Sequence, residues 1–380
     1  MNYTDTKQHY EILDGLRGVA AIMVVLTHIT QSYAKDFFSF PIGHGYLAVD
    51  FFFVLSGFVI GYAYDDRWNK MTTLDFMKRR LIRLHPMVIA GSVIGAILFY
   101  FADCEIYPLI HDTKWWMLLI AFVLCSLMIP LPYSYDIRIR QEMFPTNGPQ
   151  WTLFYEYVAN IVYALVLRRL PTKILVALVV IAAFFTIDWG LGWNVLDKPG
   201  YFYIGLFEFG WSTNIPHVHV ALVRLSYPFI AGLLLSRTKA YITLKGGFWW
   251  CALIIVLVLC WPHLGGYDQT TFWYNGLYET LCILLVFPLV VSIGAGSRMT
   301  DKRSTQICNF LGEISYPIYI THFPLIYIHE KWVFLNKGAS LPIMIGEAVL
   351  VFCLSVGIAY ALYRYYDLPV RKILKKKLIG

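Results

Sequence analysis

Long apolar stretches dominate this chain, and short polar segments separate them. A helix needs about 20 mostly apolar residues to cross the hydrocarbon core of a bilayer. By that criterion the sequence predicts ten membrane-spanning helices over residues 16–34, 46–65, 84–103, 149–167, 174–189, 218–236, 246–263, 276–294, 308–328 and 340–363. The expected fold is an all-α polytopic membrane protein.

An eleventh apolar stretch, residues 115–131, is shorter and ends in the sequence IPLP. The basic residues indicate its arrangement, because cytoplasmic loops of membrane proteins are enriched in Lys and Arg. If this stretch does not cross fully, most of the 31 lysines and arginines lie on the same side as the N-terminus. We therefore expect a re-entrant or interfacial segment at 115–131, with both termini in the cytoplasm.

The composition agrees with a protein whose outer solvent is lipid. Hydrophobic residues make up 58% of the chain and charged residues only 14%, against about 25% in soluble domains. The net charge of +7 is explained by positive-inside loops, so it does not indicate nucleic-acid binding. We expect no cleavable signal peptide and no soluble domain, so that residues 1–380 form one integral-membrane domain. The seven cysteines show no paired or metal-type spacing, and a homo-oligomer is compatible with the sequence.

Ionisable residues inside apolar segments are costly and are usually functional. Arg17 and His28 lie in the first segment on one helical face, about 16 Å apart along the axis. Asp50, near the outer end of the second segment, is expected at a depth that allows contact with His28. A carboxylate that orients a histidine produces a general base. The alternatives are a packed, structural His28 and an Asp50 that caps its helix.

Two arginines of the sequence KRRLIRLHP, Arg80 and Arg83, share a helical face at the cytoplasmic entrance of the third segment. Arginine pairs well with phosphate, so both are candidates for binding a phosphorylated donor such as coenzyme A. Ordinary positive-inside anchoring would explain the same charges.

Three later segments carry Glu156, Arg224 and His322 within apolar sequence. Each is expected in the outer half of the membrane, as is His28, and this convergence predicts one polar site. His217 and His219 have weak spacing for a metal site, and we assign no metal there.

Taken together, these segments resemble the acyltransferase family 3 membrane proteins. ILDGLRGVAAIMVVLTH is similar to the opening segment of that family, LAVDFFFVLSGFVIG to its second, and RRLIRLHP contains its RxxR. WTLFYEY is similar to a Trp-Ser-Leu-x-x-Glu segment, and DLPVRK to a terminal acidic-x-Pro-x-Arg. RLSYPFIAG and LGEISYPIYITHFP resemble the later segments. Thr152 stands where the family usually has Ser, and Asp367 where Glu is commoner.

The resemblance implies an O-acyltransferase, usually an O-acetyltransferase, in the bacterial inner membrane. The donor would be acetyl-CoA or another acyl-CoA as co-substrate, with no permanently bound cofactor. The acceptor would be a carbohydrate or a lipid-linked sugar. We expect catalytic roles for His28 (as base or transient acyl carrier), Asp50, Glu156 and His322, donor binding by Arg17, Arg80 and Arg83, and acceptor binding by Trp151, Tyr155 and Arg224.

A transporter or flippase also has a polar chamber inside a helix bundle. The chain shows no inverted repeat, which counts against that alternative. A membrane protein without catalysis is a further alternative, but it does not explain why the polar residues share one depth. Aromatic residues in or near the 190–217 segment are suited either to stacking on sugar rings or to interfacial anchoring: Trp189, Trp193, Tyr201, Tyr203 and Trp211.

Overall fold

The computed structural model describes residues 9–193, 195, 207–265 and 269–379, and every regular element in these ranges is helical. The helices are α1 (Glu11–Gln31), α2 (Ala48–Tyr64), α3 (Thr73–Leu98), α4 (Leu109–Asp112), α5 (Trp115–Ser126), α6 (Gln150–Leu165), α7 (Thr172–Leu191), α8 (Ile215–Thr238), α9 (Gly247–Leu259), α10 (Gln269–Leu281), α11 (Phe287–Gly296), α12 (Lys302–Thr321), α13 (Phe323–Leu335), α14 (Leu341–Leu362) and α15 (Leu368–Leu378). The expected all-α polytopic fold is confirmed.

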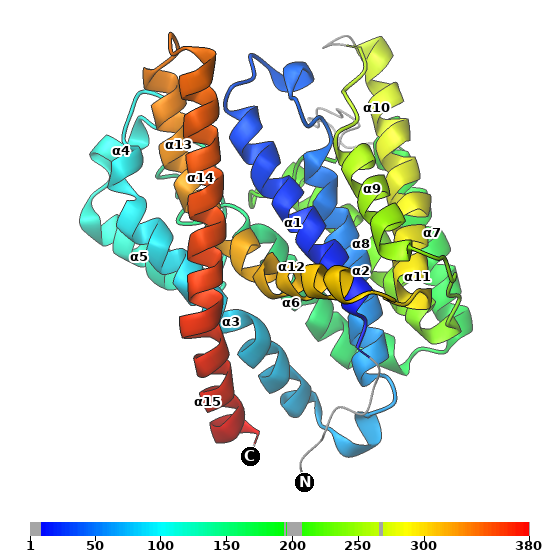
Figure 1. Cartoon of the computed structure of the whole chain (residues 1–380). Coiled ribbons are helices and arrows are strands. Elements are labelled where there is room, and N and C mark those ends of the chain that lie inside the picture. The colour runs from blue at the N-terminus through cyan, green and yellow to red at the C-terminus, as the bar shows by residue number, and fades with distance from the viewer. Residues whose placement is uncertain (1–8, 194, 196–206, 266–268, 380) are drawn as a thin grey trace.

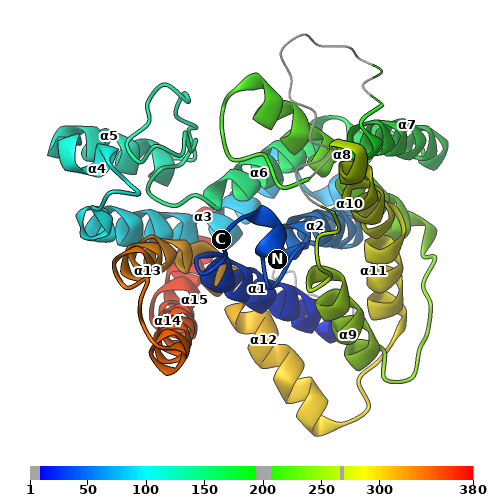
Figure 2. The same cartoon turned by 90° about the horizontal axis from the view of Figure 1, so that it is seen from above.

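Helices α1 and α2 lie at the centre of the bundle, and the other long helices surround them (Figures 1 and 2). The end of α1 and the loop that follows it lie at the upper end in Figure 1, whereas the end of α2 and the end of α15 lie at the lower end. The polar residues that the sequence places on α1 and α2 are therefore held in the interior.

Helices α2 and α8 pack with their backbones in close approach. A Cβ atom added at Gly57 would lie 2.0 Å from the carbonyl oxygen of Phe229, and one at Gly232 would lie 2.0 Å from that of Val54. Small residues such as Gly57 and Gly232 allow such approach in membrane helices. The tight contact fixes the position of Asp50 on α2 relative to Arg224 on α8.

Seven helices are long and apolar enough to cross a membrane within the described residues. They include α1, α2, α3, α7 and α8, and two longer rods over 273–296 and 341–378. Each rod contains a π-helical segment just before a Pro, which has no N–H group to donate to the helix. The three remaining expected spans are shorter or broken. The spans expected at 149–167 and 246–263 are α6, with 16 residues, and α9, with 13.

The span expected as a single helix over 308–328 is two helices, α12 and α13, that meet at His322. Pro317 lies inside α12 and Pro324 lies at the start of α13, and each proline removes one backbone donor from a continuous helix. In Figure 1, α12 runs sideways across α1, while α13 runs along α14. This break places His322 at a corner next to α1.

The short apolar stretch at 115–131 forms α5, which has 12 residues and packs against α3. Twelve helical residues extend about 18 Å, too little for a hydrocarbon core of about 30 Å. Its large apolar side chains, such as Trp115, Trp116 and Leu119, are exposed on the surface. A short, lipid-facing helix agrees with the expected re-entrant or interfacial element.

Candidate active site

His28 and His322 face each other across the junction of α1, α12 and α13. Their rings are nearly parallel, with centroids 5.5 Å apart. Nδ1 of His28 lies 3.2 Å from Oε1 of Gln31, and because that oxygen can only accept, the contact favours the tautomer that carries its proton on Nδ1. Nε2 of His28 then keeps its lone pair, as a general base or a nucleophile requires.

His322 has a matching arrangement. Its Nδ1 lies 2.9 Å from the carbonyl oxygen of Ile318, to which it donates, and its buried Nε2 has no hydrogen-bond partner among the described residues. Both histidines therefore present an Nε2 lone pair. The sequence predicted that both histidines belong to one polar site, but not that their rings stack. It also missed Gln31, although the position of Gln31 three residues after His28 on one helix was the available signal.

The chamber that contains His28 lies at the upper end of the molecule and has a volume of about 1280 Å³. We call it the upper chamber. Its polar and aromatic lining includes His28, Gln31, Trp151, Glu208, Trp211 and Arg224. His322 lies at its edge, since the neighbouring Phe323 is part of the lining and its ring centroid is 4.9 Å from that of His28.

Asp50 pairs with Arg224 and not with His28. Both carboxylate oxygens accept from this guanidinium, at 2.7 Å from Nη2 and 3.2 Å from Nε, and both side chains are fully buried. Arg224 also donates to the backbone carbonyls of Tyr46 and Phe209. The expected contact in which Asp50 orients His28 is wrong, because the approach of α2 and α8 gives Asp50 a closer and oppositely charged partner.

Glu156 is paired with Arg80, at 2.6 Å between Oε1 and Nη2, and also accepts from the hydroxyl of Ser56. It was expected in the outer half of the membrane and in one polar site with His28, and the expectation of a single site is wrong, because the two residues line different cavities. Helix α6 begins in the interior: Gln150 is fully buried and donates to Ser92 Oγ in α3. The prediction assumed that this helix begins at the membrane surface. Because α6 begins deeper, Glu156 lies further from the upper end than expected.

Glu156 and Arg80 line a second cavity of about 460 Å³, which we call the middle cavity. Arg17 and Arg83 also line it, and Arg17 is held by Asp14 at 3.0 Å. Arg17 and His28 therefore open onto different cavities, one above the other along α1. Val49 and Tyr319 line both the middle cavity and the upper chamber, so these two cavities meet at that point.

The motif residues Trp151, Thr152 and Tyr155 of α6 have different surroundings. Trp151 lines the upper chamber, with Arg224 Cζ 5.4 Å from its ring centroid. Thr152 lies 2.8 Å from the hydroxyl of Tyr319, a contact that a Ser hydroxyl could also make. Tyr155 is buried against Phe154 and lines none of the three cavities described in this section, so the structure does not support its expected contact with the acceptor.

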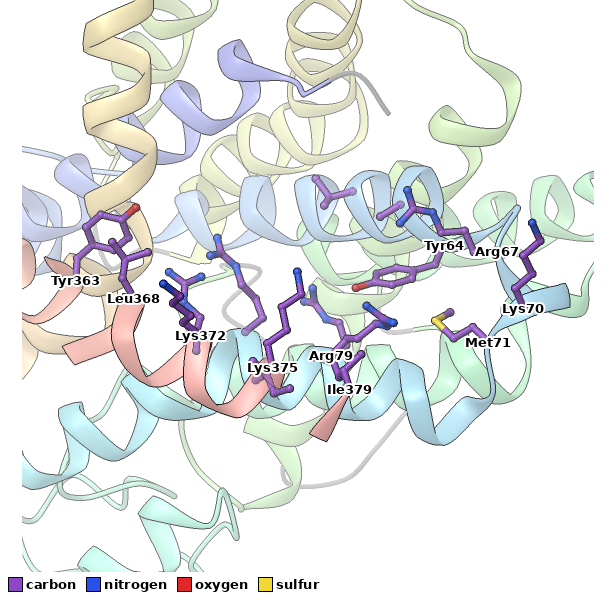
Figure 3. A pocket seen from close by; sticks show the side chains of 16 residues that line it. Tyr64, Arg67, Lys70, Met71, Arg79, Tyr363, Leu368, Lys372, Lys375 and Ile379 are labelled. Carbon is purple, nitrogen blue, oxygen red and sulfur yellow. The ribbon is translucent and has the colours of Figure 1, made fainter. Parts of the chain in front are cut away.

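A third cavity, of about 740 Å³, lies at the lower end between the end of α2, the start of α3, and α15 (Figure 3). We call it the basic cavity, because eight of its lining residues are cationic and none is acidic among the described residues: Arg67, Lys70, Arg79, Arg80, Arg83, Arg371, Lys372 and Lys375. It shares Val59, Arg80 and Arg83 with the middle cavity. In the terminal motif, Asp367 is buried and pairs with Arg371 at 2.5 Å.

The aromatic residues in or near the 190–217 segment have different surroundings. Trp211 lines the upper chamber, where its ring packs against that of His217. Trp189 is buried and Trp193 is exposed, while Tyr201 and Tyr203 lie outside the described residues. Only Trp211 is therefore in a position to contact a molecule in the chamber, among the aromatic residues of this group that the structure describes.

The chain matches the sequence model of a known family, the Acyltransferase domain, over residues 10–364. It belongs to the acyltransferase 3 family. This is the family that the motifs, taken in their order, had implied.

Three curated proteins show how far the similarity extends. The chain is 24% identical to peptidoglycan O-acetyltransferase OatA of Listeria monocytogenes, over 97% of this chain and 56% of that protein. It is 22% identical to a putative O-acetyltransferase of Staphylococcus aureus, over 95% of this chain and 57% of that protein. It is 33% identical to protein 2 in the picA locus of Rhizobium radiobacter, over 41% of this chain and 82% of that protein. The chain thus spans little more than half the length of the two O-acetyltransferases, and no solved structure matches it.

Glu208 gives the protein a pH-dependent group in the upper chamber. The carboxylate is half-buried, and the loss of hydration raises its pKa from 4.5 to about 7, although Arg224 acts in the opposite direction. Between these two pH values the unfolded chain ionises while the folded protein keeps the proton, so the free energy of unfolding falls as the pH rises. Over this pH range, the free energy of unfolding should fall about 1–3 kcal/mol less in Glu208→Gln than in the wild type.

The measurement is the thermal unfolding midpoint in detergent at pH 5 and pH 7.5. Glu105→Gln, at an exposed carboxylate outside the chamber, serves as the control. Its thermal midpoint should change between pH 5 and pH 7.5 by the same amount as that of the wild type. If the midpoint changed by the same amount in Glu208→Gln and in the wild type, Glu208 would be ionised throughout this pH range.

Proposed function

We propose that the acyltransferase moves an acyl group, acetyl in the first instance, from cytoplasmic acyl-CoA to a hydroxyl of a carbohydrate in the upper chamber. The observation that carries the proposal is the series of three cavities. It begins with a cluster of cations, continues past Arg80 and Arg83, and ends at two stacked histidines. A donor that is anionic at one end and reactive at the other matches this series.

The basic cavity supports a polyphosphorylated donor. Eight cationic residues without an acidic neighbour in the lining create a strongly positive potential, and arginine binds phosphate through paired N–H groups. Coenzyme A carries a diphosphate and a 3′-phosphate at one end of the molecule and the acyl thioester at the other. The middle cavity, with its apolar walls around Arg17 and Glu156, would take the extended arm between them.

The chemical step is assigned to His28. Its Nε2 takes the proton of an acceptor hydroxyl while the hydroxyl oxygen attacks the thioester carbonyl carbon. The carbon–sulfur bond then breaks, the coenzyme A sulfur leaves, and the imidazolium returns the proton to it. A route through a transient acyl-His28 is the second version of this step. Nε2 of His322 would accept a hydrogen bond from a neighbouring hydroxyl of the acceptor.

A sugar acceptor is supported by the aromatic lining of the upper chamber. The rings of Trp151 and Trp211 provide apolar faces for stacking, and Arg224 and Glu208 provide polar groups beside them. One relative is named a peptidoglycan O-acetyltransferase, and a carbohydrate or lipid-linked sugar is the acceptor class we propose here.

The proposed membrane is the bacterial inner membrane, with the basic cavity toward the cytoplasm. Acyl-CoA is a cytoplasmic metabolite, and cationic residues are enriched on that side of membrane proteins. The N-terminal side of α1 and the end of α15 would then both face the cytoplasm, and the upper chamber would open to the outer side.

The test uses purified protein in lipid nanodiscs with radiolabelled acetyl-CoA and a panel of sugar acceptors. We expect label in a covalent product, or acetyl-CoA hydrolysis when no acceptor is present. Failure of every acyl-CoA to bind or react, together with passage of an unmodified sugar across proteoliposomes, would favour a transporter that has kept the family fold.

Arg83→Ala tests the donor end of the path. Arg83 is exposed and lines both the basic and the middle cavity, whereas Arg80 is engaged by Glu156. Loss of a charged hydrogen bond of about 1.5–3 kcal/mol should raise the KM for acyl-CoA about 10- to 100-fold, with little change in kcat. Arg303→Ala, at an exposed position outside the three cavities, is the matched control. An unchanged KM in Arg83→Ala would remove Arg83 from the donor site.

A further inference from the structure

Three side chains that the acyl-transfer path does not use converge near the upper end of the bundle: His44, His263 and Glu279. His44 precedes α2, His263 follows α9, and Glu279 belongs to α10. The exposed fractions are 0% for His44, 8% for His263 and 0% for Glu279. Two imidazoles and a carboxylate from three separate segments, gathered out of water, form the ligand set of many zinc sites.

The distances suit a metal ion. One ligand atom from each residue lies within 4.8 Å of the other two, and Nε2 of His44 is 3.5 Å from Oε1 of Glu279. A tetrahedral Zn²⁺ with bonds of about 2.0–2.1 Å holds neighbouring ligand atoms about 3.3 Å apart. Small rotations of buried side chains are enough to close the remaining difference.

Hydrogen bonds already orient two of the three ligands, His44 and Glu279. Nδ1 of His44 lies 2.8 Å from the carbonyl oxygen of Trp261, which leaves Nε2 as the free ligand atom, and Nε2 has no hydrogen-bond partner among the described residues. The second oxygen of Glu279 accepts from the backbone N–H of Phe207 at 2.7 Å. Metal-binding histidines and carboxylates typically have such outer partners, which fix the tautomer and the orientation.

The charge of Glu279 gives an independent reason for a cation. Its hydrogen bonds come from the hydroxyl of Tyr46 and from Phe207, and no Lys or Arg forms an ion pair with it among the described residues. A buried carboxylate without a cation is costly, and a divalent ion would neutralise it. The hydroxyl of Tyr46 also lies 3.1 Å from Nε2 of His263, so it is close to two of the three residues and is a candidate for a fourth ligand.

We propose that His44, His263 and Glu279 bind a divalent transition-metal ion, with Zn²⁺ as the best fit and the hydroxyl of Tyr46 or a water in the fourth position. The burial of all three ligands assigns the ion a structural role, tying together the segments before α2, after α9 and in α10. The backbone carbonyl of Tyr46 accepts from Arg224, so the ion would also hold one wall of the upper chamber in place.

The experiment measures metal binding directly, on full-length protein freed of any affinity tag. After treatment with a chelator and then ZnCl₂, we expect about one Zn²⁺ per chain in the wild type by elemental analysis. The variants His44→Gln, His263→Gln and Glu279→Gln should each retain less than about a tenth of this amount. His111→Gln, at an exposed histidine on α4, is the matched control and should bind as the wild type does.

A second measurement on the wild type alone guards against variants that fail to fold. CoCl₂ added to the chelator-treated protein should produce the visible absorption of four-coordinate Co²⁺, and ZnCl₂ should abolish that absorption. The chelator should also lower the thermal midpoint of the wild type and not that of a folded Glu279→Gln. No Co²⁺ absorption, with Zn²⁺ no higher in the wild type than in the variants, would overturn the proposal and leave a network of neutral hydrogen bonds. Both readouts are independent of acyl transfer.

Discussion

Loss of the His28 imidazole is expected to reduce acyl transfer by about 10²–10⁴-fold, the usual contribution of a positioned general base. In His28→Ala the acceptor hydroxyl has no Nε2 lone pair to receive its proton, while the basic and middle cavities keep their lining. Binding of acyl-CoA should therefore change little. The measurement is the initial rate of label transfer from radiolabelled acetyl-CoA, with donor affinity determined separately on the same preparation.

His85→Ala is the matched control for this variant. His85 is a half-buried histidine of the bundle that lies 3.4 Å from the hydroxyl of Tyr157 and lines none of the three cavities. Its loss should leave the rate within a few-fold of the wild type. Full activity in a folded His28→Ala would assign the chemistry to another group, with His322 as the first candidate. Label that stays on the wild-type protein after rapid gel filtration at neutral pH, is released by hydroxylamine and is absent in His28→Ala would support the acyl-histidine route.

The second large effect is expected at the buried ion pair between Asp50 and Arg224. In Arg224→Met the carboxylate of Asp50 is left in the interior without its cation, which typically costs about 3–5 kcal/mol. We expect a lower thermal midpoint and less monodisperse protein on gel filtration in detergent. The double variant Asp50→Asn/Arg224→Met removes both charges and should recover part of the loss.

A solvent-accessible pair in the same chamber provides the comparison. Arg140 and Glu330 form an ion pair at 2.7 Å, but the Arg140 side chain is 37% exposed. Water screens this pair, so Arg140→Met should cost about 1 kcal/mol or less. If Arg224→Met were no more destabilising than Arg140→Met, Asp50 would be protonated in the folded protein and the buried pair would not be ionic.

Several features of the site could be predicted because they depend on short stretches of sequence. Arg17 and His28 lie on one helix, and the spacing of residues on a helix places both along the interior of α1. Arg80 and Arg83 are likewise neighbours on α3 and line one cavity, as their spacing indicated. The motifs in their order also led to the family, which the match over residues 10–364 confirms.

The contacts between helices could not be predicted in the same way. Depths estimated from residue spacing allowed Asp50 to contact His28 and placed Glu156 in the same outer half of the membrane, whereas the structure pairs these carboxylates with Arg224 and Arg80. The estimates assumed straight helices that begin at the membrane surface. Helix α6 begins in the interior, and α12 and α13 meet at a corner. A helix that begins in the interior or bends at a corner changes the depth of its side chains in the membrane by several ångströms.

The sequence by itself determined that this protein is an all-helical membrane protein of the acyltransferase 3 family and which residues are too polar for lipid. Its apolar periodicity, its charge distribution and its ordered motifs depend only on local chemistry. Only the tertiary structure decided which polar residues are partners, where the three cavities meet, and that His44, His263 and Glu279 converge. These features depend on helix packing between segments far apart in the chain, because a hydrogen bond or an ion pair needs its atoms within about 3 Å of each other.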